Sequence, residues 1–448
     1  LKTTPTDAVK LRPRNSALII LLGTALLQTV AIVLMPPALS DDALRYRADG
    51  KLWLLGESPY AHTPARLREI AEDDNEFELD LLDAAVPFQD IKTIYLPVSQ
   101  GAFAATAALE LAMLPMPQTV PPDTQIGWRS IVVDLPLVHR LLPMRLMCAL
   151  CVIGCASVLI TMLHDARRSV WWAVLLAWNP LTISEAAGNG HQDWLGILLV
   201  LIALRQLQHD RGSRAGIALG LAALVKPHVL ILLPFMLRRA WNRHGFAKAA
   251  RQLLATSTVI ALVVLAVMPW QNGFAGWFET MTKFAGEWEA NGLLYRLTVD
   301  GLTDPAAQGQ DAFAAKAAAR AGAVILLSVA WLVLWITRAS VAGAGYVLFT
   351  LALAVSPVAY PWYLGWSLAL VPLISTYPRL AGLTVLTWSA TIVVAHNLWD
   401  QQAATGMWRL PYGLLWWQYA PVFAVALLEL SLVKRQPMAH QLGRRPIP

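Results

Sequence analysis

Long apolar runs recur along this 448-residue chain, and they constrain its fold more than any other feature. The first extends from Ser16 to Pro37, and only 14% of all residues are charged, compared with about 25% in ordinary soluble domains. A helix needs about 20 apolar residues to cross a bilayer, where its backbone polar groups must be satisfied internally. The chain is therefore predicted to be an all-α, polytopic membrane protein.

About 12 transmembrane helices are expected from these runs, together with juxtamembrane helices on the outer side. Basic residues flank both ends of 215–240, so we predict two half-spans there, broken at Lys226-Pro227 because proline ends a helix. The run 97–115 contains Glu110, and we expect a juxtamembrane or re-entrant helix at the outer face. The expected spans are 16–37, 141–163, 169–186, 193–209, 215–226, 228–240, 251–270, 318–338, 342–358, 361–377, 380–398 and 413–433.

Loop charges predict the orientation. Basic residues concentrate in short loops, which face the cytoplasm under the positive-inside rule, so we expect cytoplasmic N- and C-termini. Within the first outer loop, 38–140, residues 38–96 carry 13 Asp and Glu against 6 Lys and Arg. We expect the second outer loop at 271–317, an acidic surface helix at 66–83, and one membrane domain over 1–448. We place this domain in a bacterial inner membrane, with the site facing the periplasm.

Composition also excludes some functions. Cytoplasmic loops account for the net charge of +6, so no nucleic-acid partner is expected. Cys148, Cys151 and Cys155 lie on one face of an apolar run without accompanying His or carboxylate residues. We interpret them as packing residues and expect no zinc site.

Polar side chains gather at the outer ends of the expected spans. Ionisable groups at membrane depth are costly and mark functional sites by default. Each of them also has a structural interpretation, such as a helix-bridging carboxylate, a snorkelling lysine or an aromatic belt. The candidates are Asp41, Asp42, Tyr95, Gln100, Glu185, Asn189, His191, Asp193, Lys226, His228, Trp362 and Tyr363.

This set suits glycosyl transfer from a lipid carrier. An acceptor hydroxyl needs a general base, for which Asp42 is the candidate, with Asp41 as its neighbour. A departing lipid phosphate needs positive or hydrogen-bonding partners, for which we expect His191, Lys226 and His228. An aromatic side chain such as Tyr363 would flank the sugar. The expected partners are thus a polyprenyl-phosphate-linked sugar, a glycolipid or glycan acceptor, and the bilayer.

Two other functions remain open. A transporter of lipid-linked sugars would also use broken helices, but its charges would lie near the midplane, and no inverted repeat relates the two halves of the chain. A polymerase or ligase of lipid-linked glycans would use a pyrophosphate-linked donor and would be expected to carry more cations outside.

Five motifs resemble those of a known enzyme group. They run in order through SDDALRYRADG, IYLPVSQ, WNPLTISEAAGNGHQD, LAALVKPHVLILLP and SPVAYPWYLGW. This order resembles the GT-C superfamily of integral membrane glycosyltransferases, and within it the bacterial polyprenyl-phosphate-mannose-dependent mannosyltransferases.

The resemblance implies a GT-C fold and an inverting hexosyltransferase with mannose as the preferred sugar. It aligns the catalytic aspartate with Asp42, with Asp41 as the alternative, and includes Arg45 and Tyr46 in the same motif. It places His191 near the donor phosphate. No cofactor and no metal are expected, although the Asp41–Asp42 pair leaves a divalent ion open.

Overall fold

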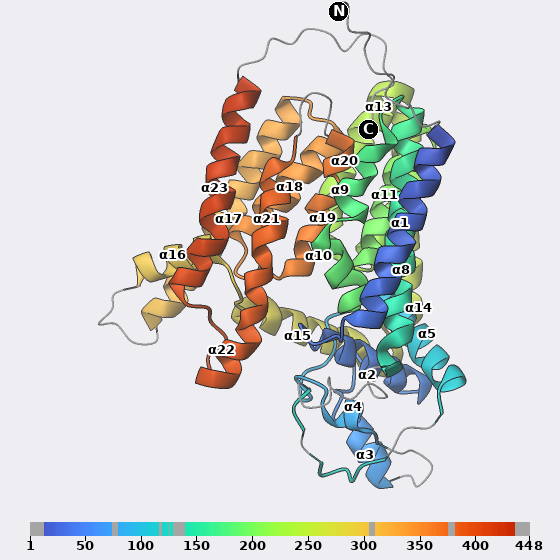
Figure 1. Ribbon diagram of the computed structural model, residues 1–448, viewed down its shortest axis with the longest axis vertical. Coiled ribbons are helices and arrows are strands. Elements are labelled where there is room, and N and C mark those ends of the chain that lie inside the picture. The colour runs from blue at the N-terminus through green and yellow to red at the C-terminus, as the bar shows by residue number, and fades with distance from the viewer. Residues whose placement is uncertain are drawn as a thin grey trace, which may run out of the picture.

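The computed structural model describes residues 13–73, 79–115, 119–124, 126–128, 139–303, 310–374 and 381–434. Within these ranges the regular elements are helices, and no strand is formed. Figure 1 shows long helices running side by side, with α2 (Asp42–Leu54), α3 (Arg66–Asp73), α4 (Leu81–Ala84) and α5 (Pro97–Met113) together at the lower right and α22 (Asn397–Thr405) apart from them at the lower left.

Five described helices are long and apolar enough to cross a membrane, which supports the predicted all-helical, polytopic architecture. The expected number of 12 spans is not established, because several other expected spans are shorter helices. The five long helices are α1 (Pro13–Leu34), α8 (Leu142–Asp165), α14 (Phe246–Val267), α17 (Gln310–Ile336) and α23 (Tyr412–Lys434).

Two expected spans, 169–186 and the described part of 361–377, which ends at 374, are chains of short helical pieces. The first contains a 3₁₀ turn, then α9 (Val174–Ala177) and α10 (Pro180–Ile183), and runs into a π-helical turn at Ser184–Gly188. Asn179 starts a new helix here, because its side chain accepts a hydrogen bond from the backbone N–H of Leu181. π-Helical turns are frequent at functional sites.

The predicted break at Lys226-Pro227 is present. α12 (Gly212–Ala223) ends just before it, and a 3₁₀ segment (Pro227–Leu232) leads into α13 (Leu233–His244). Lys226 itself is extended, as expected for a residue that precedes proline. The other described helices are α11 (Asp193–Gln208), α15 (Gly273–Glu287), α16 (Leu293–Leu302), α18 (Val341–Val355), α19 (Gly365–Leu368), α20 (Val371–Ile374), α21 (Leu383–Thr391) and α22 (Asn397–Thr405).

The run 97–115 forms α5 (Pro97–Met113), which packs against α2 (Asp42–Leu54). A Cβ atom at Gly50 would lie 2.3 Å from the carbonyl oxygen of Phe103, so only glycine permits this approach. α5 lies beside α2 at the lower end of the bundle (Figure 1). Its relation to a membrane stays a prediction.

The expected acidic surface helix at 66–83 is wrong in two respects. α3 (Arg66–Asp73) and α4 (Leu81–Ala84) are separate helices, and Asp80 and Asp83 are buried, 0% and 4% exposed. Residues 74–78 lie outside the described residues.

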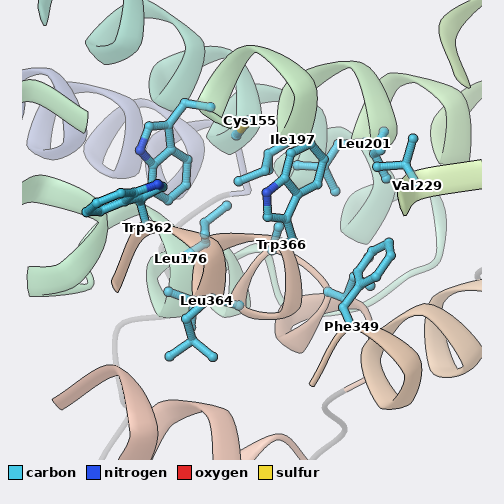
Figure 2. Packing of buried hydrophobic residues seen from close by; sticks show 14 of the residues in the cluster. Cys155, Leu176, Ile197, Leu201, Val229, Phe349, Trp362, Leu364 and Trp366 are labelled. Carbon is cyan, nitrogen blue, oxygen red and sulfur yellow. The ribbon is translucent and has the colours of Figure 1, made fainter. Parts of the chain in front are cut away.

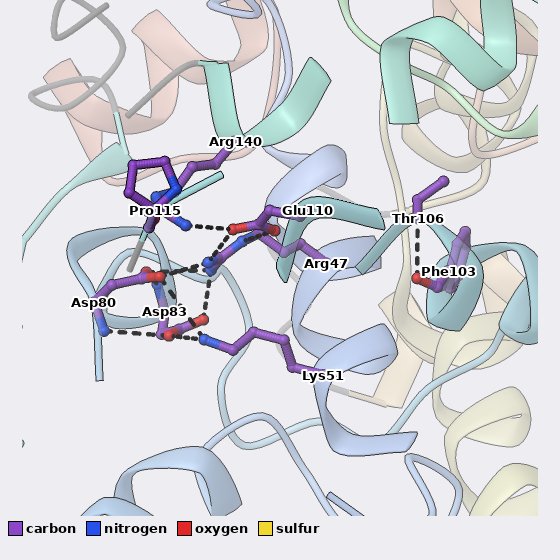
Figure 3. Close-up of polar contacts among 9 residues, drawn as sticks. All are labelled: Arg47, Lys51, Asp80, Asp83, Phe103, Thr106, Glu110, Pro115 and Arg140. Atoms are coloured by element: carbon purple, nitrogen blue, oxygen red, sulfur yellow. Dashed lines mark hydrogen bonds and ion pairs between the residues drawn. The ribbon is translucent and has the colours of Figure 1, made fainter. Parts of the chain in front are cut away.

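Both buried aspartates pair with cations of α2, which the charge count of the loop could not reveal (Figure 3). Arg47 binds Asp80, Asp83 and Glu110, while Lys51 binds Asp83. Arg140 also donates a hydrogen bond to Glu110, 3.0 Å long. We call these six residues the ionic cluster. Its ion pairs hold α2 against α4 and α5.

The core of the bundle is apolar. Figure 2 shows Trp362 and Trp366 among buried side chains that include Ile197 and Leu201. The three cysteines are buried in the same cluster with free thiols, in agreement with the packing role predicted for them.

Candidate active site

Asp42 begins α2, directly after the loop that leaves α1. A carboxylate is favourable in the first turn of a helix, where backbone N–H groups lack partners. Tyr46 lies one turn later, and its hydroxyl donates a 3.2 Å hydrogen bond to Asp42 Oδ2. Its ring stacks on Phe103 of α5, with ring centroids 4.5 Å apart. The packing of α2 on α5 therefore orients the carboxylate.

His191 lies behind Asp42. Gly190 has a φ of 77°, which turns the chain after the π-helical segment and brings His191 toward α2. The imidazole has no exposed surface and stacks on the Trp362 ring, 3.7 Å between centroids. Its Nδ1 is 3.5 Å from Asp42 Oδ2, and its Nε2 is 3.2 Å from Glu185 Oε2. This ring thus bridges two carboxylates.

A second histidine extends the chain of polar groups. His396 Nε2 is 3.0 Å from Glu185 Oε1, and its Nδ1 is 2.9 Å from the carbonyl oxygen of Leu39. Asn189 also donates to Glu185, at 3.3 Å. The sequence analysis missed His396, a lone histidine that follows an apolar run and has no motif around it.

Asp41 and Asp42 differ in their surroundings. Asp41 Oδ1 accepts a 3.2 Å hydrogen bond from Trp399 Nε1. Burial, followed by the adjacent charge of Asp42, raises the pKa of Asp41 to about 7. Burial lowers the pKa of His191, but Asp42 and Glu185 outweigh this effect and raise that pKa to about 9. With this raised pKa, His191 is cationic at neutral pH and lies 3.5 Å from the carboxyl group of Asp42.

Lys226 reaches the site from the helix break. Its Nζ lies 2.5 Å from Asp193 Oδ1 and 3.7 Å from the centre of the Tyr363 ring. Asp193 Oδ1 also accepts a 2.8 Å hydrogen bond from Trp366 Nε1. The ammonium group is thus held by a charge pair and an aromatic face.

Three cavities meet at the two aspartates. The apolar cavity, about 320 Å³, is bounded by α15, α18 and the break at Lys226 and contains Lys226 and His228. The central cavity, about 90 Å³, lies between Asp42, Arg45 and Tyr95. The aromatic cavity, about 800 Å³, includes Phe88, Trp288, Trp399 and Trp408.

The two carboxylates face different cavities. Asp42 lines the apolar and central cavities, and Asp41 lines the central and aromatic cavities. A group bound in the apolar cavity and one bound in the aromatic cavity would therefore approach each other beside Asp42.

The structure separates the sequence-predicted residues into two sets. Nine line the apolar or central cavity: Asp41, Asp42, Arg45, Tyr46, Tyr95, Lys226, His228, Trp362 and Tyr363. Five others line neither of these cavities and lie behind them as buried supports: Gln100, Glu185, Asn189, His191 and Asp193.

Gln100 illustrates the supporting set. Its Nε2 donates to Asp49 Oδ2 and Thr93 Oγ1, and its Oε1 accepts from Trp53 Nε1. Asp49 in turn accepts a 2.9 Å hydrogen bond from Arg45. Gln100 thus holds α2 against α5.

Among the described residues, no three or more His, Cys, Asp or Glu side chains are grouped so that they could hold a metal ion. The expectation that no metal is needed stays a prediction.

Residues 133–361, just over half of the chain, match the model of glycosyltransferase family 87. A protein of Mycolicibacterium smegmatis named probable alpha-(1->6)-mannopyranosyltransferase is 24% identical over 407 residues, covering 81% of this chain and 66% of the relative. Alpha-(1->6)-mannopyranosyltransferase A of Mycobacterium tuberculosis is 25% identical over 389 residues, covering 83% of this chain and 68% of the relative. The chain thus spans about two thirds of the length of these curated relatives. No solved structure matches it.

Proposed function

Because the chain belongs to glycosyltransferase family 87, we propose that it transfers a sugar from a polyprenyl-phosphate donor to an acceptor hydroxyl, with Asp42 as general base. One observation carries this proposal: Asp42 lies where the apolar cavity meets the central cavity, with Lys226 on the apolar side. The carboxylate is thus open to both substrates.

The apolar cavity suits the lipid donor. Most of its lining is apolar, including Phe349, Leu353 and Met281, which would contact the isoprenoid chain. Lys226 and His228 lie at its polar end, and we assign the phosphate contact to Lys226 first. His191 was expected beside the phosphate, but its lack of exposed surface favours a role in positioning Asp42.

The transfer is a single displacement. The acceptor oxygen attacks the anomeric carbon while Asp42 accepts the hydroxyl proton. The bond from that carbon to the phosphate oxygen breaks, and its electron pair leaves with the lipid phosphate. The configuration inverts, because the oxygen attacks opposite to the leaving group. Lys226 offsets the charge that develops on the phosphate.

Mannose is the preferred sugar, because both curated relatives are named as mannopyranosyltransferases.

We place the reaction at the periplasmic face of a bacterial inner membrane, as the loop charges predict. We expect turnover to persist in EDTA, because Lys226 supplies a cation where a metal would otherwise be needed.

The test uses purified protein in nanodiscs with polyprenyl-phosphate mannose, glucose or arabinose and a membrane-lipid extract as acceptor. Mass spectrometry follows release of free polyprenyl phosphate in the wild type and in Asp42→Asn. We expect release from mannose donor alone, lowered by about 10²–10⁴-fold in Asp42→Asn with donor binding retained. Full turnover in Asp42→Asn would show that Asp42 is not the general base and would assign that role to Asp41. Absence of release with every donor, despite donor binding, would instead favour the polymerase or transporter function.

A further inference from the structure

The aromatic cavity has no role in donor binding as proposed above. Lys226 does not line it, and it shares Asp41, Phe88 and Trp399 with the central cavity. Its volume of about 800 Å³ lies within the usual range of small-molecule sites. A ligand seated there would present one end to Asp41 and Asp42.

Two aromatic pairs line this cavity. Phe88 lies against Trp288 with ring centroids 4.9 Å apart, and Trp399 lies against Trp408 at 5.2 Å. These residues come from the first outer loop, from the segment after α15, and from α22 with the loop that follows it. Aromatic faces are electron-rich and apolar, so they bind the polarised C–H faces of a sugar ring.

The charges of the cavity disfavour an anionic ligand. Lys316 is the only cation among its described lining residues, and its Nζ lies 2.8 Å from Glu289. Glu289 also accepts a 3.0 Å hydrogen bond from the Tyr295 hydroxyl. Glu287 and Asp41 add further carboxylates to the lining. A phosphate group would therefore meet an excess of negative charge.

The backbone at Phe88 supports a binding role. Phe88 has a φ of 51°, a conformation that bulky residues rarely adopt, and its side chain is 48% exposed. Arg45 Nη1 donates a 3.3 Å hydrogen bond to its carbonyl oxygen. The strained backbone at Phe88 thus holds an exposed aromatic ring between the central and aromatic cavities.

We propose that the aromatic cavity binds the acceptor as a neutral oligosaccharide, held between Phe88 with Trp288 and Trp399 with Trp408. This inference rests on the proposed transfer, because it identifies the acceptor of that reaction. The terminal sugar would extend past Asp41 into the central cavity and bring its hydroxyl to Asp42. Acidic and amide groups at the wall, including Gln402, are placed to hydrogen bond to sugar hydroxyls.

The first measurement is glycan binding without donor. Saturation-transfer NMR is recorded on the protein in nanodiscs with a neutral oligosaccharide of mannose, and with the same oligosaccharide carrying a terminal phosphate. We expect the neutral glycan to bind and the phosphorylated one to bind about tenfold more weakly or not at all. Trp408→Ala should weaken binding about tenfold. Trp417→Ala, a matched change at an exposed position of α23, should leave it unchanged.

The second measurement is the acceptor KM in the transfer assay. We expect Trp408→Ala to raise the KM for acceptor and not for donor. Phe88→Ala serves as a second variant, because its exposed side chain can be removed without opening the core. Asp42→Asn should lower transfer by the factor given above but retain glycan binding. Glycan binding by the wild type without transfer from any donor would overturn the proposed function alone. Equal glycan binding by the wild type and both aromatic variants, or preference for the phosphorylated glycan, would overturn this inference alone.

Discussion

His396 Nε2 lies 3.0 Å from Glu185 Oε1, although 211 positions separate the two residues in the chain. Through Glu185 and His191, this contact links η7 (Ile392–His396) to Asp42 at the start of α2. The proposed base is thus held by a line of buried ionisable groups that crosses the site.

Glu185→Gln should weaken catalysis most at alkaline pH. Glu185 helps to raise the pKa of His191 to about 9, so the imidazole stays cationic through neutral pH and loses its charge as the pH rises through that value. Without Glu185 that pKa falls, and Asp42 loses its cationic neighbour at a lower pH. We expect kcat at pH 8 to fall by roughly tenfold more than kcat at pH 6. Glu279→Gln, an exposed carboxylate paired with Lys92, is the matched control. A uniform loss at both pH values would indicate a purely structural role.

Asp41→Asn should change the pH profile near neutrality. The pKa of Asp41 is raised to about 7, so the wild type gains a second negative charge beside Asp42 as the pH rises through 7. This charge repels the negative charge that develops on the departing lipid phosphate in the transition state, and we expect activity to decline there. The variant should lack the decline near pH 7 and keep only the one near pH 9. Asp90→Asn, an exposed change in the same loop, should retain both.

The same group affects stability. Because folding raises the pKa of Asp41, the protonated form is favoured in the folded state. Asp41 therefore contributes to the free energy of unfolding. This contribution is complete below about pH 4, the pKa of the carboxyl group in the unfolded chain, and it is lost as the pH rises through about 7. Thermal unfolding should therefore shift to lower temperature over this window in the wild type, and less so in Asp41→Asn. An identical shift in both proteins would contradict the assigned pKa.

Lys226→Ala should raise the KM for donor. A hydrogen bond to a charged group contributes about 1.5–3 kcal/mol, so we expect a rise of roughly tenfold or more, with Lys226→Arg retaining part of the affinity. Removing Lys226 also leaves Asp193 without its ion pair, so thermal stability is measured alongside. Lys248→Ala, at an exposed position near the start of α14, is the control. An unchanged donor KM in a folded Lys226→Ala protein would exclude the phosphate contact.

Arg47→Met should destabilise the protein strongly. Removing one partner of a buried ion pair costs about 3–5 kcal/mol, because Asp80, Asp83 and Glu110 would remain buried without their shared cation. Since the ionic cluster clamps the helix that carries Asp42, turnover should fall as well. Arg66→Met removes a more exposed arginine from the same loop and should cost only about 0–1 kcal/mol. Denaturant unfolding in detergent compares the two variants, and equal losses would show that the ionic cluster is not a clamp.

Much of the helical layout followed from local pattern. Several apolar runs predicted helices close to those observed, and Pro227 predicted the break beside Lys226. The prediction of one acidic surface helix over 66–83 is wrong, because the charge content of a loop does not indicate which of its carboxylates are buried. Asp80 and Asp83 are buried because Arg47 and Lys51 lie one turn apart on α2 and face them.

The sequence by itself determined that this chain is a helical membrane protein, and it predicted a polar site at the ends of the helices that includes Asp42, Lys226 and Trp362. These conclusions depend on hydropathy, proline and short motifs, which act within a few residues. Only the tertiary structure decided that His396 supports Glu185 and that Trp399 and Trp408 form an aromatic wall beside Asp41. Such contacts join residues hundreds of positions apart, and they arise from how the helices pack.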